Sequence, residues 1–116
     1  KQTINTESDS AEKWLLPYGY LEKHSQVGLY GAGDVGRSYF RQLQRSDDYN
    51  LCAWADKNHQ KIITTEYKVI SPEQLLNIDF DILLIGVAEI EVAMDIMDDL
   101  TKLGIPARKL VWDIGR

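Results

Sequence analysis

The stretch that decides the fold reads Val27-Gly28-Leu29-Tyr30-Gly31-Ala32-Gly33-Asp34-Val35-Gly36. Its first four residues form a short apolar run, which is typical of a buried parallel strand. The glycines follow the pattern GxGxxG: Gly31 allows a tight turn, Gly33 lets a phosphate approach the backbone, and Gly36 lets a helix pack closely on the strand. An amphipathic helix is expected from about Asp34 to Gln44. A strand, a glycine loop and a helix in this order predict a phosphate-binding turn.

An acidic residue farther along the chain supports this interpretation. Asp56 lies 20 residues beyond Gly36, directly after a second predicted strand at Leu51–Ala55. A carboxylate at that place can accept hydrogen bonds from a ribose. Because a 2′-phosphate would meet a like charge there, Asp56 favours NAD over NADP as the cofactor, and Lys57 beside it weakens that preference.

The rest of the chain alternates predicted strands and helices. We expect a short strand at Tyr67–Ile70, a helix opened by Ser71-Pro72-Glu73, a buried strand at Asp81–Ile85, a helix at Glu89–Leu103 and a last strand at Lys109–Trp112. Such alternation is typical of an α/β domain with a parallel sheet and right-handed crossovers. The sequence therefore predicts a Rossmann-like three-layer domain over residues 17–116, with five parallel strands in the order 3-2-1-4-5. Residues 1–16 are predicted to be a polar N-terminal tail or a short helix.

Composition and charge exclude several classes of function. The chain has 116 residues and a formal net charge of -5, so we expect neither nucleic acid nor an anionic membrane as the main partner. Its one cysteine, Cys52, can form neither an intrachain disulfide nor a thiolate metal cluster. Neither a membrane-spanning run of about 20 apolar residues nor a signal peptide is visible. We therefore expect a cytoplasmic domain, and both ends are interpreted as those of a domain cut from a longer protein.

One residue inside the glycine loop favours a different interpretation. Asp34 could cap the N–H groups that a phosphate would use, and its charge would repel a phosphate. The glycines would then serve packing and turn geometry alone. Gly86, in contrast, follows the strand at Asp81–Ile85 and could line a ligand crevice at the carboxyl edge of the sheet. The candidate cofactor-binding residues are Gly31, Ala32, Gly33, Asp34, Val35, Gly36, Asp56 and Gly86, and no catalytic or metal-binding residue is predicted.

Charged residues on the helices are interpreted as surface residues. Arg37, Arg41 and Arg45 recur every four residues as a solvated stripe, although Arg37, one residue past the loop, could assist an anionic ligand. The helix at Glu89–Leu103 is likewise expected to carry surface charge, at Glu89, Glu91, Asp95, Asp98 and Asp99. Its apolar face is expected to lie in the core, with Ile90, Met94, Met97 and Leu100. No nucleophile–base pair stands out in the sequence.

Several motifs taken together resemble a known pattern. They are Leu29 to Arg37, Trp54-Ala55-Asp56-Lys57, Ser71-Pro72-Glu73, Phe80 to Ile85 and Leu103-Gly104-Ile105-Pro106. This pattern is similar to the Rossmann-like nucleotide-binding modules of bacterial polysaccharide and lipopolysaccharide biosynthesis proteins, and it covers about residues 15–112. These modules include N-terminal domains of nucleotide-sugar dehydratases and epimerases and accessory domains fused to glycosyltransferases. The resemblance implies a domain that serves cell-envelope sugar assembly, with Gly31 to Gly36 as the phosphate loop and Asp56 as the ribose acceptor.

The favoured function is a non-catalytic module that binds a nucleotide or dinucleotide within a larger sugar-transferring or sugar-modifying protein. Its expected ligand is a nucleotide or nucleotide sugar, with NAD as the candidate cofactor. Its expected partners are other domains of the parent chain, and a homodimer is left open. One alternative is the N-terminal part of an NAD-dependent nucleotide-sugar dehydrogenase, epimerase or dehydratase, although the Tyr-x-x-x-Lys pair of short-chain reductases is absent. The other alternative is a ligand-free interaction domain.

Overall fold

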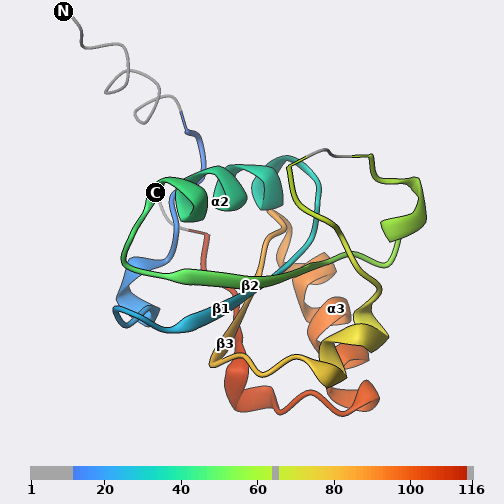
Figure 1. Ribbon diagram of the computed structural model, residues 1–116. Helices are drawn as coiled ribbons and strands as arrows, with labels where there is room; N and C mark the ends of the chain where they lie inside the picture. Colours follow the sequence, from blue (N-terminus) through green and yellow to red (C-terminus); the bar gives the residue numbers. More distant parts are fainter. Residues whose placement is uncertain (1–11, 64–65, 115–116) are drawn as a thin grey trace, which may run out of the picture.

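One parallel sheet with a helix on each side organises the domain. The computed structural model describes residues 12–63 and 66–114. The four strands of the sheet, in the spatial order β2-β1-β3-β4, are β1 (Gln26–Tyr30), β2 (Asn50–Ala55), β3 (Ile82–Ile85) and β4 (Leu110–Val111). The α-helices are α2 (Asp34–Arg45) and α3 (Ile90–Leu103). Short 3-10 helices occupy the connections: η1 (Tyr18–Tyr20), η2 (His59–Lys61), η3 (Pro72–Asn77) and η4 (Ala107–Lys109). Figure 1 shows α2 on one side of the sheet and α3 on the other.

Side chains of β1 alternate between two cores, because successive residues of a strand point to opposite faces. Val27 and Leu29 pack with Phe40 on the α2 side, while Tyr30 packs with Leu100 on the α3 side. The amphipathic helix expected from about Asp34 to Gln44 is confirmed as α2, which buries an apolar face: Val35, Tyr39, Phe40 and Leu43.

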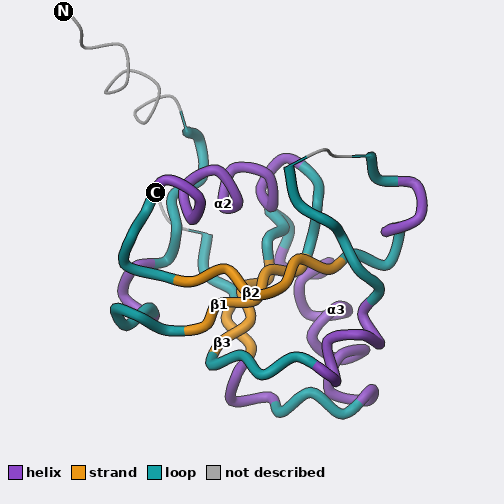
Figure 2. Tube along the Cα trace, viewed as in Figure 1, coloured by secondary structure: helices purple, strands orange, loops and turns teal. Residues whose placement is uncertain are grey.

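The prediction of a five-stranded Rossmann-like sheet in the order 3-2-1-4-5 is wrong. The sheet has four strands, because the segment expected as the third strand, Tyr67–Ile70, forms only an isolated parallel bridge between Ile70 and Ala55. Tyr67 instead packs edge-on against Phe40, with ring centroids 5.8 Å apart. The chain bends at Glu66 and Tyr67, so only Ile70 pairs with β2, and Figure 2 shows this part of the chain as loop.

Two smaller expectations also need correction. Residues 12–16 form no helix but a loop segment with bends at Lys13 and Trp14 that is bonded to α2, here called the N-terminal strap (Glu12–Leu16). The remainder of the predicted tail, residues 1–11, lies outside the described residues. On α3, Ile90 and Met94 are exposed rather than buried, because the helix packs on the sheet through Ala93 and Leu100. In the described part of the chain, no helix is long and apolar enough to cross a membrane.

Candidate functional site

A pocket of about 550 Å³ opens where the carboxyl ends of β1, β2 and β3 meet. Seven of the eight candidate residues line it: Gly31, Ala32, Gly33, Asp34, Val35, Asp56 and Gly86. The eighth, Gly36, lies behind the loop against Gly31. The pocket is within the range of cavities that hold small molecules and cofactors. The structure thus brings the sequence-predicted residues to one place, and their role in binding stays a prediction.

Three hydrogen bonds fix the glycine loop to its surroundings. The N–H of Gly31 donates to the Ala55 carbonyl over 2.8 Å, and the indole N–H of Trp54 donates to the Gly31 carbonyl over 2.7 Å. Arg37 Nε donates to the Ala32 carbonyl over 2.9 Å. Arg37 therefore holds the loop main chain, a role that its place in a predicted solvated stripe did not indicate.

Asp56 makes the fourth connection to the loop. One carboxylate oxygen, Oδ2, accepts from the N–H of Ala32 over 2.8 Å, and the other, Oδ1, accepts from the N–H of Asn58 over 2.7 Å. A carboxylate offers about four lone-pair sites, so Asp56 retains capacity to accept from a ribose hydroxyl. The sequence placed this residue correctly at the end of β2, but it did not indicate that the carboxylate would also bind the loop.

Packing accounts for three of the glycines at the site. A Cβ on Gly36 would lie 1.9 Å from the Gly31 carbonyl oxygen, and one on Gly86 would lie 3.0 Å from the Gly36 Cα. Gly31 has a φ of +109°, which L side chains rarely adopt. Gly33 differs, because a Cβ there would meet nothing within 4 Å. The absence of a side chain at Gly33 is therefore not required by the fold, and it leaves the start of α2 open to the pocket.

Asp34 does not act as the cap that the sequence allowed. It is the first residue of α2, after the N-cap residue Gly33, and its carboxylate has no hydrogen bond among the described residues. The first main-chain bond of the helix runs from the N–H of Arg37 to the Gly33 carbonyl. The N–H groups of the first turn before Arg37 therefore have no acceptor within the helix and remain available to a ligand.

The charged lining of the pocket is mainly acidic. Four carboxylates and one ammonium contribute: Asp34, Asp56, Asp95, Asp99 and Lys57. Asp95 and Asp99 are two of the residues predicted to carry surface charge. Both are exposed, but their spacing of four residues on α3 places them on the side that faces the pocket. Tyr30 also lines the pocket, and burial raises the pKa of its phenol, so the hydroxyl stays protonated at neutral pH.

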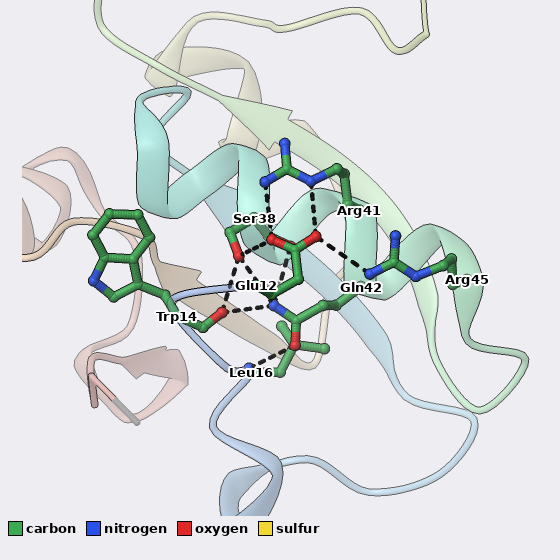
Figure 3. Close-up of polar contacts among 7 residues, drawn as sticks. All are labelled: Glu12, Trp14, Leu16, Ser38, Arg41, Gln42 and Arg45. Carbon is green, nitrogen blue, oxygen red and sulfur yellow. Dashed lines mark hydrogen bonds and ion pairs between the residues drawn. The ribbon is translucent and has the colours of Figure 1, made fainter. Parts of the chain in front are cut away.

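The N-terminal strap supplies one wall residue that the sequence did not reveal, Trp14. The strap is held by α2, where the Glu12 carboxylate accepts from Ser38, Arg41 and Arg45 (Figure 3). Two of the arginines expected to be solvated therefore form ion pairs. No periodic pattern marks a contact between residues 26 or more positions apart, so this attachment could not be predicted from the sequence.

Comparisons with known proteins identify one match. The model of the C2185-like, N-terminal family matches residues 23–111, which include β1 through β4 and the whole glycine loop. No curated protein matches the chain.

Proposed function

The chain belongs to the C2185-like, N-terminal family, and from its pocket we propose that the domain binds a nucleotide or dinucleotide. The observation that carries the proposal is Gly33. Packing requires glycine at Gly31, Gly36 and Gly86, whereas no contact of the described residues requires it at Gly33, where an N-cap residue with a side chain would also fit. A phosphate that approaches the N–H groups at the start of α2 needs the space that such a side chain would occupy.

The proposed module does not catalyse a reaction by itself. The pocket lining of the described residues contains carboxylates, one ammonium and Tyr30, with no serine, cysteine or histidine to pair as nucleophile and base. Its resemblance to modules of polysaccharide biosynthesis proteins supports a place beside the transferring or modifying domains of a larger protein. The same resemblance supports the alternative of an N-terminal part of an NAD-dependent nucleotide-sugar enzyme, for which other domains would supply the catalytic groups.

A titration monitored by thermal unfolding tests the proposal. NAD, NADP, coenzyme A and nucleotide sugars are each added to the domain. A ligand at 100 times its Kd stabilises a fold by about 2.7 kcal/mol, which for a domain of this size raises Tm by on the order of 10 °C. The absence of a shift with all of these compounds would overturn the proposal.

NAD is expected to bind at least about tenfold more tightly than NADP. The Asp56 carboxylate lines the pocket at the end of β2, so a 2′-phosphate would meet a like charge. The two Kd values can be compared by isothermal titration calorimetry. Asp56→Asn removes the charge and keeps one acceptor oxygen. It should therefore bring the Kd values for NAD and NADP closer together. Equal binding of both dinucleotides to the wild-type domain would contradict the assignment of Asp56.

Gly33→Asp is expected to abolish nucleotide binding while leaving the fold at least as stable. Gly33 is the N-cap of α2, and aspartate is a better N-cap residue than glycine. The new carboxylate would bind the N–H groups of the first turn and place a charge where the phosphate is expected. Asp34→Ala is the matched control, since it removes a negative charge and should raise the affinity for phosphate-bearing ligands. Retained binding in Gly33→Asp would show that no phosphate uses the start of α2.

A ligand-free interaction domain remains the second candidate, and one observation favours it. The N–H of Ala32, a donor of the glycine loop, already has the Asp56 carboxylate as its partner, and most charged groups around the pocket are negative. Under this alternative, no compound of the titration would bind, and neither Gly33→Asp nor Asp34→Ala would therefore change any affinity. The two candidates therefore predict opposite results in the same experiments.

A further inference from the structure

The N-terminal strap is fastened to α2 by its main chain as well as by its side chains. The carbonyl of Trp14 accepts from Ser38 Oγ over 3.0 Å and from Gln42 Nε2 over 2.6 Å. The N–H of Leu16 donates to Gln42 Oε1 over 3.1 Å, and the Leu16 side chain is only 2% exposed. The two polar side chains of α2 that make these bonds are themselves buried. Specific hydrogen bonds to buried side chains of α2 therefore fix the N-terminal strap in place.

An ionic contact adds to this attachment at the start of the strap. The Glu12 carboxylate is 6% exposed and accepts from Arg41 Nε over 2.8 Å, Arg41 Nη2 over 2.9 Å and Ser38 Oγ over 2.7 Å. A further contact from Arg45 Nη2 measures 3.3 Å. Figure 3 shows the carboxylate enclosed by these groups, while the indole ring of Trp14 extends away from them.

Buried polar contacts of this kind define position more than they add stability. Burying a serine and a glutamine costs free energy that their hydrogen bonds only offset, so apolar residues would hold a strap equally firmly. Ser38 and Gln42, however, fix the main chain at Trp14 itself. The residue whose position these contacts determine is therefore the one strap residue that lines the glycine-loop pocket.

We infer that Trp14 is a ligand-contacting residue of this pocket, and that Glu12, Ser38 and Gln42 position it against the planar ring of the bound nucleotide. The inference rests on the proposed function. It assigns ligand contact to a pocket residue that lies before residues 23–111, the part of the chain that the family model matches. An indole contributes to nucleotide binding through stacking or edge contact with a base, which does not depend on phosphate charge. Such a contact suits a pocket whose lining is acidic. Lys13 Nζ, 5.0 Å from the centre of the indole, places an ammonium close by.

Two probes separate the base contact from the phosphate contact. AMP carries a planar base, whereas ribose 5-phosphate lacks it. Calorimetric Kd values for both are measured with the wild-type domain, Trp14→Leu and Trp14→Phe. Trp14→Leu should raise the Kd for AMP by about 5- to 150-fold, which is the range for aromatic–base stacking, and should change the Kd for ribose 5-phosphate by less than about twofold. Trp14→Phe should restore most of the AMP affinity.

The positioning residues are tested by a second pair of variants. Arg41→Ala removes the main partner of Glu12. It should raise the Kd for AMP severalfold without changing the Kd for ribose 5-phosphate. Lys102→Ala, which removes the exposed ion pair with Asp98 on α3, is the matched control and should change neither. Urea unfolding of each variant verifies that it is folded before binding is compared.

The outcomes distinguish the two proposals. If the wild-type domain binds neither probe nor any compound of the titration, the proposed function fails and the role of Trp14 fails with it. If AMP binds the wild-type domain and Trp14→Leu equally, only the present inference is overturned. Equal weakening of both probes in Trp14→Leu would also overturn it, because the indole would then serve only the fold.

Discussion

Gly36→Ala is expected to destabilise the domain by on the order of 4 kcal/mol, a large fraction of the stability of a small domain. The new Cβ would lie 1.9 Å from the carbonyl oxygen of Gly31 and 2.6 Å from its carbonyl carbon. Both atoms belong to the backbone, and Gly31 is fixed by hydrogen bonds to Ala55 and Trp54. Neither partner can move aside, so α2 would have to separate from β1.

Urea unfolding followed by circular dichroism measures this effect. Gly19→Ala is the matched control, because a Cβ there would meet nothing within 4 Å, and its free energy of unfolding should stay within about 0.5 kcal/mol of the wild-type value. Similar unfolding midpoints for the two variants would show that the close approach of α2 to the glycine loop is not what the structure indicates.

Glu12→Gln is expected to lower the free energy of unfolding at pH 7 by on the order of 2 kcal/mol, the range for hydrogen bonds to charged groups. The Arg41 guanidinium beside it holds the pKa of the Glu12 carboxyl at about 2, against 4.5 for the free side chain. The folded domain therefore binds this proton less tightly than the unfolded chain. The stabilisation is fully present above pH 4.5 and is lost as the pH falls toward 2.

A pH series isolates this contribution. The difference in free energy of unfolding between wild type and Glu12→Gln should be constant from pH 5 to 7 and should shrink between pH 4.5 and 2. Asp98→Asn removes a carboxylate from an exposed ion pair with Lys102 and serves as the control, with an expected effect below about 1 kcal/mol. A difference that does not change down to pH 2 would mean that the Glu12 charge does not hold the strap.

The sequence predicted those features that depend on local pattern. The helix expected at Asp34–Gln44 forms at Asp34–Arg45, and the strand expected at Asp81–Ile85 forms at Ile82–Ile85. Periodicity and glycine spacing also predicted that the glycine loop lies beside Asp56. The loop follows β1 and Asp56 follows β2, and these parallel strands end at the same edge of the sheet. These signals come from neighbouring residues, and tertiary contacts did not override them.

Features set by distant contacts could not be predicted in this way. Whether Tyr67–Ile70 becomes a strand depends on its pairing with β2, and only Ile70 makes that contact. The strap has no periodic pattern, and its attachment depends on groups of α2 that resemble an ordinary polar helix face in the sequence, such as Ser38 and Arg41. Trp14 was missed as a pocket residue for the same reason.

The four hydrogen bonds that hold the glycine loop have a consequence for the rate and thermodynamics of the proposed nucleotide binding. The main chain at Gly31 and Ala32 is anchored by hydrogen bonds to Ala55, Trp54, Asp56 and Arg37. A rigid receptor loses little conformational entropy when it is occupied, and encounter requires no prior rearrangement. The loop backbone should therefore superimpose closely between the free and the nucleotide-bound domain. The conformational entropy of the loop is lost during folding and not again on binding.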